Sequence, residues 1–144
     1  MIDLRPARPA DLQGICELLL AGDLFVDDVG QHLDNFVVFE QHGNIVATGG
    51  MELYPPVALL RSIAVDQQYR SKGIAIEIVN QLCNTADMAG VQNIYLLTNT
   101  ATGFFERLNF RAIARTQAPD EIKATSQFSH LCPASAQFMY KRIQ

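Results

Sequence analysis

The sequence has few cysteines, and none is placed for a disulfide framework or a zinc site. Its 144 residues contain three cysteines, Cys16, Cys83 and Cys132. They are odd in number, far apart, and without CxxC or Cys/His ligand spacing. We therefore expect no bound metal and a reducing, cytoplasmic environment.

Long apolar runs are also missing. The opening "MIDLRPARPADL" has no apolar signal region, and no stretch reaches the roughly 20 uninterrupted apolar residues of a membrane helix. We find no low-complexity segment, linker or internal repeat. A chain that is 49% hydrophobic and 18% charged has enough apolar residues for one core. The sequence predicts a soluble, unsecreted protein with a single domain over residues 1–144.

An excess of positive charge is absent as well. The formal net charge is −4, whereas general affinity for nucleic acid depends on a basic face that neutralises many phosphates. We expect neither a nucleic-acid nor a membrane partner, so any site for a polyanion must be local.

Strand and helix patterns alternate along the chain. The first expected strand spans Ile2–Arg5, and helical spacing follows from Pro9 to Leu19. A short helix is expected around Asp27–Leu33, followed by two β-rich runs that flank His42-Gly43-Asn44 as a hairpin. The remaining elements are expected in the runs "VALLRSIAV" (strand), "GIAIEIVNQLCNTADMAG" (helix), "QNIYLLT" (strand), "TATGFFERLNF" (helix ending at Leu108 or Asn109), "PDEIKATSQFSHL" (helix) and "SAQFMYKRI" (strand). This order predicts an α/β or α+β sheet covered by helices.

A short basic loop, "QYRSKGIA" (68–75), joins a strand to the longest helix. The first amides of a helix lack internal partners and carry the positive end of the helix dipole, so phosphates bind there. Gly73 allows the backbone to approach a ligand, and Arg70 and Lys72 add positive charge. Neither GxxxxGK[ST] nor GxGxxG is present, which argues against nucleoside triphosphates and dinucleotides. The alternative interpretation is a solvated turn.

The segment "RSKGIA" resembles the Q/R-x-x-G-x-G/A pyrophosphate signature of the Gcn5-related N-acetyltransferases (GNATs). "NTATGFFERLNF" resembles the second signature of that superfamily. Within it, the sequence is most similar to the arsenic-resistance-associated and amino-acid N-acetyltransferases, over nearly the whole chain. It departs from the pattern at Ser71, where glycine is frequent, and at Asn109, which replaces the glycine before Phe110. Asparagine tolerates a left-handed backbone.

This resemblance implies a mixed, mostly antiparallel sheet of six to seven strands, splayed at strands 4 and 5 and flanked by about four helices. It also implies acetyl-CoA as co-substrate. Backbone groups of Ile63 and Val65 would pair with the pantetheine arm, and Asn99 and Phe105 would form the far wall. The pyrophosphate would lie against the basic loop, formed by Arg70, Ser71, Lys72, Gly73, Ile74 and Ala75.

The resemblance leaves the catalytic groups less defined. The tyrosine that often serves as acid in this superfamily is replaced by Phe104-Phe105, and Leu59 aligns with a frequent strand-4 glutamate. Glu52 is the best remaining carboxylate for a base, acting directly or through water. The alternative for Glu52 is an ordinary solvent-facing strand residue. The nearby threonines are expected to act as caps: Thr98, Thr100 and Thr102.

Arg61 is a charged residue in an otherwise apolar strand. With the adjacent Ser62, it is predicted to recognise a carboxylate on the acceptor, because a guanidinium suits bidentate carboxylate binding. The alternative is an internal pair with an acid such as Glu52. The histidines have no partner at catalytic or metal spacing in the sequence, so surface or structural roles are expected for His32, His42 and His130.

The sequence therefore predicts an acetyl-CoA-dependent N-acetyltransferase that acts on the amine of a small, amino-acid-like molecule, as a monomer or homodimer. Two alternatives stay open. The first is a catalytically weak acetyl-CoA-binding sensor, suggested by the missing tyrosine. The second is an interaction module without a cofactor.

Overall fold

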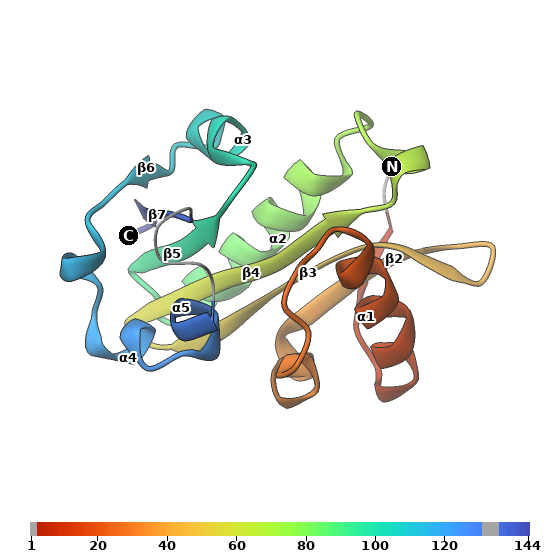
Figure 1. Cartoon of the computed structure of the whole chain (residues 1–144), viewed down its shortest axis with the longest axis horizontal. Coiled ribbons are helices and arrows are strands. Elements are labelled where there is room, and N and C mark those ends of the chain that lie inside the picture. The colour runs from red at the N-terminus through yellow and green to blue at the C-terminus, as the bar shows by residue number, and fades with distance from the viewer. Residues whose placement is uncertain (1–2, 131–135) are drawn as a thin grey trace.

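A seven-stranded mixed sheet forms the centre of the molecule (Figure 1). The structure is a computed structural model that describes residues 3–130 and 136–144. The strand order is β1-β2-β3-β4-β5-β7-β6, and every neighbouring pair is antiparallel except β4 and β5, which are parallel. The strands are β1 (Leu4–Pro6), β2 (Phe36–Gln41), β3 (Asn44–Tyr54), β4 (Val57–Val65), β5 (Asn93–Thr98), β6 (Arg111–Ala112) and β7 (Gln137–Arg142). This is the GNAT-like sheet that the sequence predicted.

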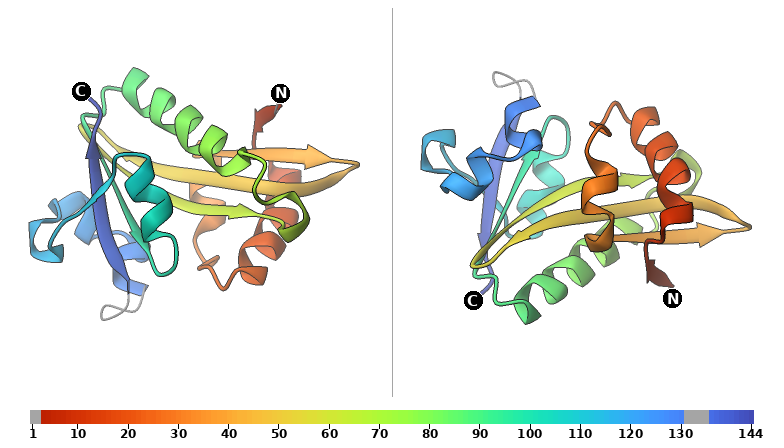
Figure 2. Two further views of the ribbon diagram at one scale, coloured as in Figure 1. Left: turned by 90° about the horizontal axis from the view of Figure 1, so that it is seen from above. Right: turned by 90° about the horizontal axis from the view of Figure 1, so that it is seen from below.

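Helices cover both faces of this sheet (Figure 2). Helix α2 packs on one face, where Ile78 and Leu82 join a core with Ala47 and Leu60. Helix α1 lies on the other face, together with the short helices α4 and α5. The α-helices are α1 (Leu12–Ala21), α2 (Ile74–Met88), α3 (Thr102–Arg107), α4 (Asp120–Lys123) and α5 (Ser126–His130), with 3-10 helices η1 (Pro9–Asp11), η2 (Val29–Asn35), η3 (Gln67–Tyr69) and η4 (Arg115–Gln117).

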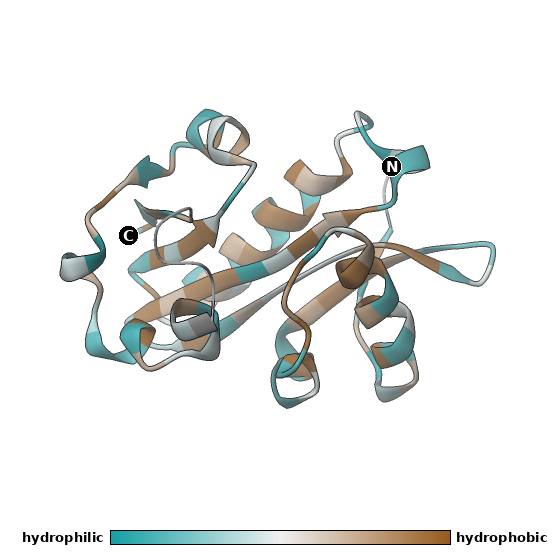
Figure 3. Ribbon diagram, viewed as in Figure 1, coloured by the Kyte–Doolittle hydropathy of each residue, from teal (hydrophilic) through white to brown (hydrophobic). Residues whose placement is uncertain are grey.

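The hydropathy pattern follows these layers. Apolar residues dominate β4 and β5 in the centre of the sheet, whereas the hairpin tip and several connecting loops are hydrophilic (Figure 3). In β4, the residues from Val57 to Leu60 are buried and apolar. Because both faces of β4 are covered, the sequence of this strand reads as a nearly continuous apolar run.

The predicted hairpin is confirmed as the β2–β3 pair. His42 and Gly43 form its two-residue turn, with φ values of 54° and 80°. Two left-handed residues match the twist of adjacent antiparallel strands. Beyond the hairpin, β3 pairs with β4 along the whole length of β4. Glu52 on β3 therefore lies next to β4, the central strand of the sheet.

Three local predictions need correction. The helix expected around Asp27–Leu33 is the 3-10 helix η2, which begins at Val29. The helix expected from "PDEIKATSQFSHL" is divided into α4 and α5, because the chain turns at Ala124 and Thr125 and the Thr125 hydroxyl accepts a hydrogen bond from the Phe128 amide. The two-residue strand β6 was not expected. None of the helices in the described residues combines the length and the apolar composition that a membrane-spanning segment requires.

Candidate active site

The basic loop leads directly into the N-terminus of α2. Gly73 caps this helix with a left-handed backbone at φ 81°, and Ser71 is also left-handed at φ 66°. The frequent glycine at the position of Ser71 is therefore explained by its backbone angle. A Cβ added at Gly73 would meet no atom within 4 Å. The space beside this helix terminus is open to a ligand.

The two basic side chains of the loop, Arg70 and Lys72, differ in their contacts with the rest of the protein. The Arg70 Nε donates a hydrogen bond to the Val65 carbonyl at 3.1 Å, which ties the loop to the end of β4. Lys72 is exposed. Arg70 is therefore held against the end of β4, whereas the Lys72 side chain is accessible to solvent.

Strands β4 and β5 separate beside this loop. Their parallel pairing covers Val57 to Leu59 on β4, opposite Asn93 to Tyr95 on β5. Beyond Leu59, β4 continues for six residues, through Ile63 to Val65, while pairing with β3. This divergence is the predicted splay, and it exposes a β4 edge toward β5.

A bulge interrupts β4 in the separated segment. The register with β3 shifts between Thr48 and Gly50, so Ser62 and Ile63 together oppose Gly49. Ser62 is left-handed at φ 60°, and a bulge of this kind re-aims the neighbouring side chains. A Cβ on Gly49 would overlap Ile78 and Ile63. Glycine is therefore required where α2 crosses the bulged pair.

Arg61, at the start of the bulge, holds two carboxylates inside the protein. Its Nη1 donates to Asp28 Oδ2 at 2.9 Å and to Glu52 Oε2 at 2.7 Å, and its Nη2 donates to Asp28 Oδ1 at 2.6 Å. The Nε donates to Ser62 Oγ at 3.1 Å. The guanidinium also lies 5.8 Å from the centre of the Phe36 ring. This is the internal pairing that the sequence left as the alternative for Arg61.

The charges in this cluster shift the pKa values of Arg61 and Asp28. Burial alone would lower the pKa of Arg61, but hydrogen bonds and charge from Asp28 and Glu52 raise it above its usual value. Burial would raise the pKa of Asp28, but hydrogen bonding and charge from Arg61 outweigh it and lower this pKa. Both groups are therefore held in their charged forms.

Glu52 occupies the centre of the cluster. It is the cross-strand partner of Leu59, the last β4 residue that pairs with β5. Its side chain is 2% exposed, so the solvent-facing alternative for this residue is wrong. Besides Arg61, its carboxylate accepts a hydrogen bond from the Tyr54 hydroxyl at 2.5 Å. Burial and this bond raise the pKa of Tyr54 well above its ordinary value, so the hydroxyl stays a donor.

His32 completes the cluster from η2. Its Nε2 lies 3.6 Å from Asp28 Oδ2 and 3.6 Å from Glu52 Oε1. No sequence pattern indicated this contact, because His32 lies on η2, Asp28 in the turn before it, and Glu52 on β3. A ligand atom from each of them falls within 4.8 Å of the others, which is metal-like spacing. However, Arg61 already donates to both carboxylates, so the cation that this set binds is a guanidinium.

The predicted far wall of the cofactor site lies after β5. Phe105 is buried and packs edge-on against Phe104 and Phe110. The Thr98 hydroxyl accepts a hydrogen bond from the Ala101 amide at 3.0 Å, which closes the turn before α3. It is not the helix cap expected for these threonines, because the N-cap of α3 is Ala101, which has no side-chain capping bond. Asn99 lies between Thr98 and α3. Asn109 has a left-handed backbone at φ 73°, the conformation expected at this position, where the family has glycine.

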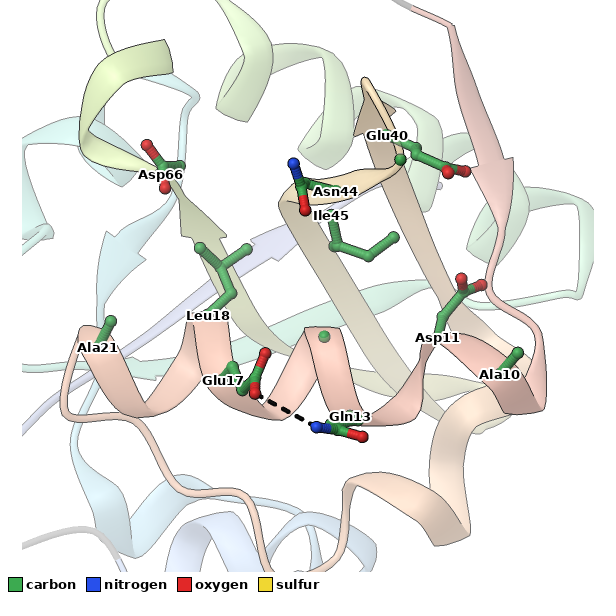
Figure 4. A pocket seen from close by; sticks show the side chains of 12 residues that line it. Ala10, Asp11, Gln13, Glu17, Leu18, Ala21, Glu40, Asn44, Ile45 and Asp66 are labelled. Atoms are coloured by element: carbon green, nitrogen blue, oxygen red, sulfur yellow. Dashed lines mark hydrogen bonds between the residues drawn. The ribbon is translucent and has the colours of Figure 1, made fainter.

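A separate hollow of about 490 Å³ lies between α1 and the β2–β3 hairpin (Figure 4). Its wall includes Glu17, Glu40 and Asp66, and Glu17 accepts a hydrogen bond from Gln13. None of the residues predicted to bind the cofactor or the acceptor lines it. Its acidic side chains would repel a pyrophosphate, and it does not include the start of α2, so it is a poor site for that group.

The described cysteines are not activated. Burial raises the pKa of both Cys16 and Cys83, which disfavours the nucleophilic thiolate. The third, Cys132, lies outside the described residues.

Comparisons with known proteins agree with this architecture. A family model described as an acetyltransferase (GNAT) domain matches residues 32–112, which is more than half of the chain. An uncharacterized N-acetyltransferase of Chlorobaculum tepidum is 28% identical over 127 residues, covering 83% of this chain and 81% of that protein. An amino-acid acetyltransferase of Mannheimia succiniciproducens is 24% identical over 128 residues, covering 83% of this chain and 29% of that protein.

Solved structures share the fold. Rv2747 from Mycobacterium tuberculosis, in complex with CoA and NLQ, superposes with a TM-score of 0.82 at 23% identity, over 99% of each chain. N-acetylglutamate synthase from Neisseria gonorrhoeae, complexed with coenzyme A and N-acetyl-glutamate, gives a TM-score of 0.84 at 13% identity. That match covers 100% of this chain and 35% of the synthase.

Proposed function

Because the chain belongs to the GNAT family of N-acetyltransferases, we propose that it transfers the acetyl group of acetyl-CoA to the amine of a small, amino-acid-like molecule. The observation that supports this most is the separation of β4 from β5 immediately beside the left-handed loop at the start of α2. The amino-acid part of the proposal is supported by the named amino-acid acetyltransferase relative and by the shared fold with N-acetylglutamate synthase. Closer assignment to an arsenic-resistance group stays a prediction.

The proposal places acetyl-CoA along the separated strand. The amides from Ser71 to Ala75 would bind the pyrophosphate, because helix amides and a glycine without a Cβ suit an anion. Ile63 and Val65 would pair with the pantetheine arm through their backbone groups. Asn99 and Phe105 would close the opposite side. Ser71 and Gly73 are both left-handed, and no protein atom lies within 4 Å of a Cβ added at Gly73, so the loop has room for the pyrophosphate at the start of α2.

Glu52 is proposed to support removal of the acceptor's proton. An ammonium group cannot attack a thioester, so a proton must leave before the C–N bond forms. Glu52 lies opposite Leu59, where the strands part and the acetyl group should lie. Its side chain is almost completely buried, so in this proposal Glu52 acts through an intermediate group and does not contact the amine directly.

Arg61 is proposed to organise this cluster. Recognition of an acceptor carboxylate by Arg61 and Ser62 stays a prediction, and it requires the acceptor to displace Asp28 or Glu52 from the guanidinium. Breaking such a buried pair is costly, because it leaves a carboxylate without its partner. We therefore favour the organising role.

The test is a panel of amines assayed for CoA release. Free amino acids, their decarboxylated amines and amino-acid-like antibiotics should be compared at fixed acetyl-CoA. The proposal expects turnover with at least one amino-acid-like amine and weak turnover with unrelated amines. Binding of acetyl-CoA without turnover on any amine would favour the sensor that the missing tyrosine suggested.

A further inference from the structure

The acid cluster around Arg61 has one comparatively accessible member in the described part of the chain that can accept a proton. The His32 side chain is 24% exposed, whereas the side chains of Asp28, Glu52 and Arg61 are 7%, 2% and 0% exposed. Tyr54 is also partly exposed, but its hydroxyl donates to Glu52. A proton that travels between solvent and the two carboxylates therefore has its most direct route through His32.

The orientation of the ring suits this role. Nε2 faces both carboxylates at 3.6 Å, which leaves Nδ1 as the ring nitrogen that points away from them. A carboxylate beside one ring nitrogen orients a histidine and stabilises the imidazolium that forms when the other nitrogen takes a proton. His32 has two such carboxylates.

We propose that His32 is the group that takes the proton from the acceptor's ammonium, while Asp28 and Glu52 position its ring and stabilise its charged form. This inference rests on the proposed acetyl transfer. The proton acceptor is then a residue of η2. Glu52 positions the His32 ring, a role that a buried carboxylate can fill without contact with the acceptor.

The acceptor's ammonium gives one proton to His32 Nδ1 and becomes a neutral amine. The amine nitrogen attacks the thioester carbonyl, a C–N bond forms, and the C–S bond breaks with the electron pair going to sulfur. The nitrogen loses its second proton, which the thiolate takes up as CoA, and His32 then releases its proton to solvent.

Several titratable or charged groups surround the ring. Asp28 approaches from the turn before η2, Glu52 from β3, and Arg61 from β4 behind both acids. Tyr54, also on β3, donates to Glu52. These four residues can also affect how the rate depends on pH. Variants of each of them, measured beside the His32 variants, separate their effects from that of His32.

The test is His32→Ala, with His32→Gln as a second variant that retains a polar side chain. We expect kcat to fall roughly 10²- to 10⁴-fold, the usual contribution of a positioned base, with an unchanged KM for acetyl-CoA. The loss should be largest below the acceptor amine's pKa and should shrink above it. Added imidazole should restore the rate of His32→Ala at least about tenfold, because a small base can enter the space that the side chain leaves.

The matched control is His42→Asn, at the hairpin turn, where asparagine tolerates the left-handed backbone. It should retain wild-type kcat. Wild-type turnover that persists in both His32 variants would overturn the inference and leave the proposed function standing. A loss that imidazole does not restore and that is equal at every pH would also overturn it. Absence of turnover in the wild-type protein would instead reject the proposed function, and this inference with it.

Discussion

Arg61 and Asp28 lie 33 residues apart in the sequence, yet they form a two-pronged ion pair, with Nη1–Oδ2 and Nη2–Oδ1 distances of 2.9 and 2.6 Å. This pair connects the centre of the sheet to the segment that precedes η2. Because Arg61 also binds Glu52, it fixes the relative position of η2, β3 and β4 at the point where β4 and β5 separate. The packing of these segments and the chemistry proposed for this cluster therefore involve the same guanidinium.

Replacing Arg61 with methionine should lower the free energy of unfolding by about 3–5 kcal/mol, the range for a buried ion pair that loses one partner. Two buried carboxylates would lose their donor. Denaturant unfolding at pH 7 measures this change. Arg111→Met is the control, since the Arg111 guanidinium donates to Tyr140 at the surface, and it should cost less than about 1 kcal/mol.

The same Arg61 variant separates the two roles considered for this residue. If Arg61 organises the cluster, an amino acid and its decarboxylated amine should lose kcat/KM by the same factor. A loss of roughly 10- to 100-fold confined to the amino acid would instead mean that Arg61 binds the acceptor carboxylate. Arg61→Lys serves if the methionine variant does not fold.

Replacing Gly73 with valine should weaken CoA binding by at least about tenfold, or 1.4 kcal/mol. The added side chain meets no protein atom within 4 Å of its Cβ, so it would enter the space assigned to the pyrophosphate. The left-handed angle adds a folding cost of about 1–2 kcal/mol. Calorimetric titration with CoA measures the affinity.

Gly90→Val provides the matched control for this backbone cost. Gly90 has φ 87°, also has no atom within 4 Å of an added Cβ, and lies just after the opposite end of α2. It should lose similar stability but retain CoA affinity. Equal affinity in the Gly73 variant and the wild type would show that the pyrophosphate binds elsewhere.

Asp11 should make stability depend on acid pH. The Arg5 guanidinium lowers the pKa of Asp11 to about 2 from its ordinary 3.8, with help from the Arg8 amide. A lowered folded-state pKa stabilises the protein above the unfolded-state value, and this contribution disappears as pH falls from about 4 toward 2. After a reduction for the partial exposure of Arg5, it amounts to about 1–2 kcal/mol.

Chemical unfolding of Asp11→Asn and the wild type at several pH values checks this. The two proteins should differ by that amount at pH 7 and converge near pH 2. A difference that is constant with pH would show that the ion pair is not its source.

The Glu52→Gln variant should transfer acetyl groups most poorly below the acceptor amine's pKa, where a proton must still be removed, and much less poorly above it. The amide keeps the shape of the side chain while it removes its charge. Steady-state rates of CoA release across pH measure the ratio of variant to wild type. A flat ratio would limit Glu52 to a structural role.

The sequence was sufficient for the features that local patterns determine. The hairpin at His42-Gly43, the helix that begins after Gly73 and the left-handed Asn109 each follow from residue types and spacing. The splay of β4 was expected from the family resemblance. Signatures that combine a glycine with a helix terminus are contiguous in sequence, so they can be recognised without a structure.

The acid cluster could not be predicted in the same way. Glu52 and Arg61 were selected individually, and their pairing was considered as one alternative. Asp28 and His32 belong to a segment with weak periodicity, and their contacts with β3 and β4 depend on how η2 packs on the sheet. Such tertiary contacts leave no fixed spacing in the sequence.

The most direct test of the whole account is to quantify free CoA and acetylated acceptor in the same reaction. Purified protein, acetyl-CoA and an amino-acid-like amine should yield the two products in equal amounts, and both should depend on the protein and on the amine. CoA release that is independent of any amine, or acetyl-CoA binding with no acetylated product across the panel, would contradict the assignment of this site to amine acetylation.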